Sequence, residues 1–302
     1  MRISTNYNLL RRWLVAGSLL SLLGLTACNS DTTSGQDPQV AEPAVPHPAD
    51  FLADSLLPTQ KQIETILKEM GHTQYEFKGN SIVVDGDIVF HRSDFMRDSS
   101  ETRALGKIAQ NTRVPISDRS KVSRDKYLRV KISPRLNDNW RKATEEAVRF
   151  WNGFAHIPFI IANGFEPEKI DVWVITGTSG HPYGTARTPS FIFADDGYHV
   201  RRVLPGNLIE VNMDRFPKLD PDLAKSVMIH LFSHAVGFDH TDSKNIYVSH
   251  IPGTPEKDKE SLFNTNPTFK YRGWITEGDW KAIKFYYPDP KKLQNRSGGA
   301  KP

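Results

Sequence analysis

The sequence has 302 residues, which is enough for one large domain or two small ones. Its content of 38% hydrophobic and 25% charged residues is ordinary for a folded protein. The net charge of +4 and the isoelectric point near 9.0 are only modestly basic. Because no recognition motif or basic helix accompanies this charge, we expect a solvated basic surface and no nucleic-acid partner.

The first 28 residues have the pattern of a bacterial lipoprotein signal peptide. Basic residues precede an apolar run at 13–25, which is too short to span a membrane. Residues 25–28, Leu-Thr-Ala-Cys, match a lipobox, and we expect lipid on Cys28 to anchor the protein to a membrane. Asn29 favours the outer membrane of the cell envelope over the inner one, and the periplasmic or surface side stays open. Cys28 is the one cysteine, which excludes a disulfide framework.

Three further stretches predict irregular connections. Residues 29–55 begin with a run of Ser, Thr, Gly, Pro and Ala and predict a disordered tether. Residues 101–126 are polar and basic and predict a linker, which is alternatively a cleavage region. Residues 291–302 are rich in Lys and Gly and predict a disordered tail.

A small α/β unit is predicted over residues 56–100. Its helix spans 59–70, where Thr59 and Gln62 have the spacing of a capping box. A β-hairpin follows at 81–90 and turns at Asp85-Gly86. This unit is either an extra packing layer or a propeptide-like cover for an active-site cleft.

The main domain is predicted over residues 127–290. Its first strand alternates apolar and basic residues, and a long helix begins at Asp138 or Asn139. The predicted strands are at 127–132, 159–161, 170–176 and 208–213. A Gly- and Pro-rich stretch at 177–197 is predicted to form the edge of a cleft. A final helix begins at Thr276 and ends before Pro288.

The most informative feature is a set of three histidines near the end of a second long helix, which Asp220 is expected to cap and Pro221 to begin. His230 and His234 are four residues apart, so their rings can point at one site from the same helix face. Gly237 allows the sharp turn that brings His240 back to that site. Three imidazoles with an open fourth position are typical of a catalytic zinc site, and the pattern predicts one zinc ion.

The spacing H-x-x-x-H-x-x-G-x-x-H resembles the zinc-binding signature of the metzincin peptidases. The stretches 227–242, 251–264 and 279–288 are similar to the dual-action HEIGH metallopeptidase family, and 83–88 resembles the N-terminal hairpin of that family. The resemblance implies an α+β fold: a metzincin-like domain with a twisted mixed sheet, two long helices and a small C-terminal subdomain with a final helix. It also implies zinc on His230, His234 and His240, and a peptide or protein ligand in the cleft.

The sequence departs from this family at three positions. Leu231 stands where those enzymes carry the catalytic glutamate, Ser233 replaces a glycine, and Phe263 replaces the methionine of the Met-turn. A leucine cannot move a proton, so hydrolysis by the usual route loses its general base. Phe263 indicates that the floor beneath the metal has been repacked.

Three hypotheses follow for function, and we favour the first. The chain is a zinc-binding pseudo-peptidase whose cleft binds peptides or partners and whose hydrolysis is lost or strongly reduced. Alternatively, it is an active zinc metalloendopeptidase with a relocated base, or a non-enzymatic lipoprotein with a structural metal closed by a fourth protein ligand. If only the base is missing, Leu231→Glu confers peptide cleavage. Neither the substrate nor the oligomeric state follows from the sequence.

Overall fold

The computed structural model describes residues 44–47, 50, 52–96, 127–162, 170–177, 182–193, 200–214, 219–243, 250–268 and 274–288. The chain divides into two compact units, Met1–Ala41 and Glu42–Pro302, and the described residues all belong to the second. The predicted signal peptide with Cys28, the predicted linker at 101–126 and the predicted tail at 291–302 lie outside the described residues. Within the described ranges, no helix is long and apolar enough to cross a membrane.

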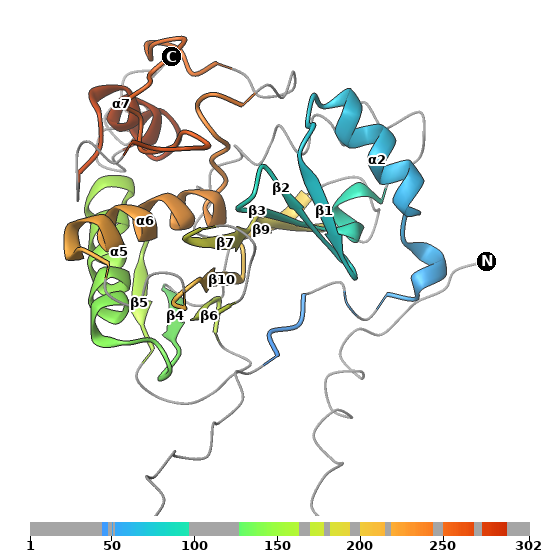
Figure 1. Cartoon of the computed structure of the whole chain (residues 1–302), viewed down its shortest axis with the longest axis horizontal. Coiled ribbons are helices and arrows are strands. Elements are labelled where there is room, and N and C mark those ends of the chain that lie inside the picture. Colours follow the sequence, from blue (N-terminus) through green and yellow to red (C-terminus); the bar gives the residue numbers. More distant parts are fainter. Residues whose placement is uncertain are drawn as a thin grey trace, which may run out of the picture. The chain divides into compact units, whose positions relative to one another are not determined.

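An eight-stranded mixed sheet forms the centre of the molecule (Figure 1). Its strand order is β1-β2-β3-β7-β10-β6-β4-β5. The strands are β1 (Tyr75–Lys78), β2 (Ser81–Val84), β3 (Ile88–His91), β4 (Leu128–Ile132), β5 (Phe159–Ile161), β6 (Val172–Thr176), β7 (Gly184–Arg187) and β10 (Leu208–Val211). Pairing is parallel from β10 through β6 and β4 to β5 and between β3 and β7, and antiparallel elsewhere. This mixed sheet confirms the predicted fold class.

Two long helices, α5 (Asp138–Ala155) and α6 (Pro221–Ala235), pack against each other, and α6 also contacts β7 and β10. Asp220 accepts a hydrogen bond from Leu223 N and Pro221 occupies the first turn of α6, as predicted. Every residue of α6 from Ser226 to Ala235 is buried. A helix buried on all sides must be apolar or satisfy its polar groups internally, so its two histidines require partners.

The C-terminal helix α7 (Glu277–Tyr286) packs against α5. It begins with the capping box that Thr276 and Asp279 predict, in which each side chain accepts a hydrogen bond from the other residue's N–H. Its buried residues join one large apolar cluster with α5, α6 and the inner strands. That apolar cluster fixes the position of the elements that carry the histidines.

The N-terminal part has its own apolar cluster but shares the central sheet. Helix α2 (Gln60–Glu69) has the predicted capping box at Thr59, and it packs on the predicted β2–β3 hairpin. The remaining short elements here are η1 (Asp54–Leu56) and η2 (Arg92–Phe95). The hairpin joins the main domain directly, because β3 pairs with β7. Residues 56–95 therefore add strands to the sheet of the main domain.

Residues 44–47 contact the same sheet, although the sequence places them in the predicted tether. Arg187 donates to the carbonyl of Val45 at 3.1 Å, and Asn207 donates to the carbonyl of Pro46 at 3.0 Å. His47 is buried and stacks on His91, with ring centroids 4.0 Å apart. Side-chain donors from the sheet thus satisfy the backbone of this segment, which composition alone does not predict.

Sequence analysis missed three strands within the Gly- and Pro-rich stretch and just after it. These are β7 and the two strands of a separate ribbon, β8 (Ser190–Phe193) and β9 (Val200–Leu204). The residues of β7, Gly-Thr-Ala-Arg, have little strand propensity of their own. Its pairing with β3 and β10 makes it a strand, and it is an inner strand where the sequence predicted the edge of a cleft.

Candidate metal centre

Three buried histidine rings converge at the C-terminal end of α6. His230 and His234 lie one turn apart on α6, and Gly237, with φ of 99°, reverses the chain so that His240 returns to them. The ring centroids are 4.7 Å apart for His230 and His234, 4.8 Å for His234 and His240, and 5.4 Å for His230 and His240. The structure thus brings together the three histidines that the spacing singled out.

A carboxylate from the N-terminal part completes this cluster. Asp87 lies between β2 and β3, just before β3 begins, and its side chain is fully buried. Its Oδ2 lies 2.8 Å from His230 Nε2 and 3.6 Å from His234 Nε2, and its Oδ1 lies 3.2 Å from His240 Nε2. One ligand atom from each of the four residues lies within 4.8 Å of the others, a grouping that can hold a metal ion.

The hydrogen bonds behind two of the rings fix their orientation. His230 Nδ1 donates to the carbonyl of Leu262 at 2.7 Å, and His234 Nδ1 donates to the carbonyl of Phe238 at 2.9 Å. Because a carbonyl can only accept, both Nδ1 atoms carry hydrogens, and in neutral rings the Nε2 atoms present lone pairs. This tautomer is the one in which a histidine binds metal through Nε2.

The atoms at the centre of the cluster fit a cation. The Nε2 atoms of His230 and His234 are 3.1 Å apart, where two lone pairs repel each other. Asp87 Oδ1 and His240 Nδ1 are buried without a hydrogen-bond partner among the described residues, and the contact from Oδ1 to His240 Nε2 is an ion-pair distance only. A set of three imidazoles and one carboxylate is a donor set that zinc accepts in tetrahedral geometry.

The charges of the cluster are strongly coupled. Burial by itself raises the pKa of Asp87, but in the metal-free cluster the charges of protonated His240 and His234 and the hydrogen bonds from protonated His230 and His234 outweigh it and hold that pKa well below its usual range. Burial lowers the pKa of His240, and the Asp87 carboxylate outweighs this and raises it. Both shifts have the direction expected for an ionised Asp87 beside protonated histidines, and metal binding would release the protons from the histidines.

Leu231 and Phe263 are packing residues in this structure. Leu231 is buried in the main apolar cluster, and its Cδ1 lies 3.1 Å from where a Cβ on Gly184 of β7 would be. Phe263 is buried and stacks on Trp151 and Phe238, with centroids 6.4 and 5.7 Å apart. Leu231 therefore gives the centre no acid or base, and Phe263 forms an aromatic floor with its two neighbours.

Other carboxylates near the motif have local roles. Asp239 accepts from the N–H of His240 at 2.6 Å, and Asp242 accepts from the N–H of Thr265 at 2.8 Å. Three other histidines of the main domain stand at positions 181, 199 and 250. His250 lies outside the cluster, and positions 181 and 199 are not among the described residues. Within the described ranges, Asp87 is thus the one carboxylate in the cluster.

The residues that carry Asp87 also cover β7, which lies in the stretch predicted to form the cleft edge. Ala186 N–H donates to the carbonyl of Asp87 at 2.8 Å, and Thr188 N–H donates to the carbonyl of Val89 at 3.0 Å. An unpaired strand beside a catalytic metal can pair with an extended peptide. In this chain that side of β7 is already paired with the chain's own β3.

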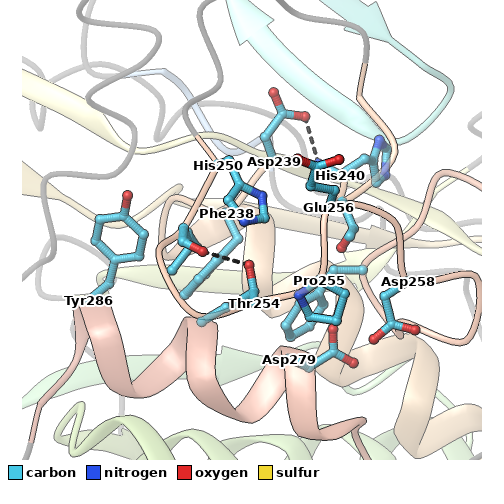
Figure 2. Close-up of a pocket in the computed structure, with 15 residues that line it drawn as sticks. Phe238, Asp239, His240, His250, Thr254, Pro255, Glu256, Asp258, Asp279 and Tyr286 are labelled. Atoms are coloured by element: carbon cyan, nitrogen blue, oxygen red, sulfur yellow. Dashed lines mark hydrogen bonds between the residues drawn. The ribbon is translucent and has the colours of Figure 1, made fainter.

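A small pocket lies beside the centre and shares only His240 with it (Figure 2). Its volume is about 90 Å³, which is room for a few water molecules. Acidic side chains gather around it, together with His250; they are Asp239, Glu256, Asp258 and Asp279. The pocket is bounded by the loop at 238–241, the loop at 250–258 and α7, and Asp87, His230 and His234 are not among its lining residues.

The fold and the site together define a mixed α/β protein with a buried His3Asp centre able to hold a metal ion. No family model matches the sequence, and no curated protein matches it. A structure of myroilysin is 14% identical and covers 57% of this chain and 97% of that chain, with a TM-score of 0.34. A second myroilysin structure is 12% identical and covers 57% of this chain and 88% of that chain, with a TM-score of 0.33.

A third similar structure is high choriolytic enzyme 1, a hatching enzyme zinc-protease from Oryzias latipes, the medaka fish. It is 15% identical and covers 56% of this chain and 96% of that chain, with a TM-score of 0.33. Sequence identities and TM-scores this low support no conclusion about the activity of this chain. Such a conclusion has to rest on its own residues.

Sequence analysis assigned Asp87 to the hairpin and missed its place in the site. Its position depends on the pairing of β3 with β7, strands that are far apart in the sequence. The one local signal is an aspartate directly before the fully buried strand β3. A charged residue there is costly to bury unless it has a partner.

Proposed function

We propose that this chain is a zinc-binding, metzincin-like lipoprotein of the bacterial envelope that holds its metal without hydrolysing peptides. The observation that supports the proposal is the position of the Asp87 carboxylate, 2.8 Å from His230 Nε2 and 3.2 Å from His240 Nε2. Four protein ligands are typical of structural zinc sites, whereas catalytic sites leave one position to solvent. The centre therefore has the donor set of a closed site, which favours the third hypothesis of a structural metal over the first, in which the metal keeps an open position.

The absence of a general base supports the same proposal. The residue after His230 is Leu231, which is buried against β7 and carries no ionisable group. General acid–base catalysis typically contributes about 10²- to 10⁴-fold to a rate. Asp87 does not replace that base, because it occupies the place of a ligand.

Zinc would connect two parts of the molecule that have separate apolar clusters. The three histidines lie on α6 and the turn after it, whose apolar residues belong to the main cluster, and the hairpin that presents Asp87 packs on α2 in the other. Binding that requires ligands from both parts stabilises their association by mass action. The proposed role of the metal is to hold the hairpin on the main domain.

The envelope location and the partner extend this proposal. Lipid on Cys28 would place the folded part at the membrane, and a peptide or protein in the cleft remains the proposed ligand. Because β3 pairs with β7 beside the histidines, such a ligand must either displace β3 or bind elsewhere along the cleft. The proposal therefore predicts weak binding of extended peptides while the hairpin is in place.

Cobalt substitution tests whether the centre is closed. An ionisable solvent ligand makes the visible spectrum of bound Co²⁺ depend on pH near neutrality, whereas four protein ligands do not. We expect one Co²⁺ per chain, a spectrum that is constant from about pH 6 to about pH 9 in the wild type, and a pH-dependent one in Asp87→Ala. Asp85→Asn is the matched control, because Asp85 lies in the same turn but contacts His72, and asparagine tolerates its φ of 51°.

A peptidase assay on the same samples tests the loss of hydrolysis. We expect no cleavage of unstructured protein by the wild type or by Leu231→Glu alone, because Asp87 still occupies the centre. Asp87→Ala combined with Leu231→Glu restores both a solvent position and a carboxylate, and is the variant in which cleavage is expected. Cleavage by the wild type that His234→Ala abolishes would instead establish an active metallopeptidase, and protein that binds no zinc would end the proposal.

A further inference from the structure

The turn at residues 261–263 contacts two of the segments that carry the histidines. The carbonyl of Leu262 accepts the Nδ1 hydrogen of His230 at 2.7 Å. The carbonyl of Phe263 accepts the N–H of Thr241, the residue after His240, at 2.8 Å. The position of this turn therefore sets the orientation of His230 and the path of the chain at His240.

A continuous chain of hydrogen bonds leads from His230 through this turn to Asp279. The peptide unit that offers the Leu262 carbonyl to His230 also carries the N–H of Phe263, which donates to Ser261 Oγ at 3.0 Å. The Ser261 hydroxyl in turn donates to Asp279 Oδ1 at 2.5 Å. The chain starts at a ring nitrogen of His230 and ends on a carboxylate.

Helix α7 holds this carboxylate in a fixed position. Asp279 is only 3% exposed, and its Oδ2 accepts from the N–H groups of Leu262 at 2.9 Å and Thr276 at 3.1 Å. Figure 2 shows it on α7, beside Pro255 and Asp258 at one side of the pocket. Three hydrogen-bond donors hold this buried carboxylate in one position and one orientation, so the negative charge of its ionised form has a fixed location.

We infer that Asp279 is a positioning residue for the metal centre, which acts on His230 through Ser261 and the peptide unit between Leu262 and Phe263. Chains of hydrogen bonds in a protein interior polarise one another, so a carboxylate at one end strengthens the acceptor at the other. A stronger acceptor at Nδ1 makes the opposite nitrogen a better metal ligand. The inference rests on the proposed function, because it requires that His230 bind zinc.

Two variants interrupt this chain and one control leaves it intact. Asp279→Asn removes the charge but keeps the shape of the side chain, and Ser261→Ala removes the hydroxyl that links Asp279 to the turn. The control, Thr276→Ala, removes the hydroxyl that caps α7 at Asp279 N but leaves the bonds from Asp279 to Ser261 and Leu262. All three substitutions weaken the start of α7 or its contacts. Only Asp279→Asn and Ser261→Ala change the hydrogen bonds that lead from Asp279 to His230.

The measurements are the zinc dissociation constant by chelator competition, the visible spectrum of the Co²⁺ form and the melting temperature of the metal-free protein. Loss of an outer partner of a metal-binding histidine typically weakens the metal by about 10- to 100-fold. We expect that loss and a shifted spectrum in Asp279→Asn and Ser261→Ala. In Thr276→Ala we expect a lower melting temperature with wild-type affinity and spectrum.

Wild-type affinity in Asp279→Asn and Ser261→Ala would overturn the inference, as would an equal loss of affinity in Thr276→Ala. If Asp279→Asn does not fold, Ser261→Ala is compared with Thr241→Val, because Ser261 Oγ also bonds Thr241 Oγ1 at 2.8 Å. An equal loss of zinc affinity in Thr241→Val, which leaves the bonds from Ser261 to Asp279 and Phe263, would overturn the inference. Failure of the proposed function is distinct, since the wild-type protein itself would then bind no zinc.

Discussion

The two sides of the metal centre are built in opposite ways. The histidine side comes from one short segment, in which helix periodicity and one glycine bring His230, His234 and His240 together. The aspartate side comes from a turn that reaches the histidines only because β3 pairs with β7. The first depends on local backbone geometry and the second on the register of the sheet. Loss of sheet pairing would therefore remove Asp87 and leave the histidines together.

The largest expected effect separates these two sides. His234→Ala removes a ligand from the histidine side, and we expect its zinc content to fall from about one ion per chain to nearly none. Asp87→Ala leaves three histidines, and we expect it to keep its zinc with lower affinity. At a free zinc concentration a thousand times the dissociation constant, bound metal adds about 4 kcal/mol to the free energy of unfolding, which His234→Ala loses entirely.

Metal analysis after gel filtration and urea unfolding with and without zinc measure both effects. His250→Ala is the control, because His250 lies outside the four-residue cluster. Equal loss of zinc in Asp87→Ala and His234→Ala would mean that the three histidines do not form a site of their own.

The contrast between the two sides also explains which features the sequence predicts. The sequence marks the starts of helices α2, α6 and α7 with the capping residues Thr59, Asp220 and Thr276, and the structure confirms all three. Strand β4 alternates buried and half-buried residues as predicted. These features depend on neighbours in the sequence, where propensity and periodicity act.

Features that depend on distant parts of the chain were missed. Strand β7 has a sequence that favours no particular structure, and its two neighbours in the sheet make it a strand. Asp87 looked like an ordinary turn residue, since nothing near it in the sequence indicates three histidines across the sheet. Residues 45–47 were predicted to be part of a tether, and nothing near them in the sequence indicates that Arg187 and Asn207 donate hydrogen bonds to the carbonyls of Val45 and Pro46.

A pH effect of intermediate size is expected on the aspartate side. His91, at the far end of β3 from Asp87, stacks on His47. Burial, with the charges of His91 and Arg187, lowers the pKa of His47 to about 3, so the folded state resists its protonation. Burial raises the pKa of Asp94 to about 7, against a hydrogen bond from His91 and the charge of Arg187, so the folded state favours its protonation.

The two groups act with opposite sign over the same range of pH. As the pH falls from about 6.5 to about 4, the unfolded state protonates His47 and the folded state does not, so stability falls. Over the same range the folded state protonates Asp94 ahead of the unfolded state, so stability rises. Each contribution is at most roughly 1.4 kcal/mol per pH unit, and the two oppose each other. Burial also lowers the pKa of His91, against the charge of Asp50, so His91 acts in the same direction as His47.

Asp94→Asn removes one of these contributions. We expect the free energy of unfolding of Asp94→Asn to fall relative to the wild type by about 1 kcal/mol for each pH unit between about pH 6 and about pH 4. Urea unfolding at both pH values measures it. A second substitution, His47→Gln, removes the other contribution and is expected to make the profile less steep, and an equally steep profile in the double variant would show that the acid response comes from other groups.

The smallest expected effect concerns the floor of the histidine side. Phe263 stacks on Trp151 and Phe238 and is buried, and it takes part in the hydrogen bonds of its turn only through its backbone. A methionine of similar volume can fill this space, and substitutions that conserve volume in a core usually cost less than about 1.5 kcal/mol. Phe263→Met is therefore expected to bind zinc with wild-type affinity and to lose roughly 1 kcal/mol of stability in urea unfolding. A large loss of zinc affinity in Phe263→Met would show that the aromatic floor positions the histidines, as the carbonyls of Leu262 and Phe238 do.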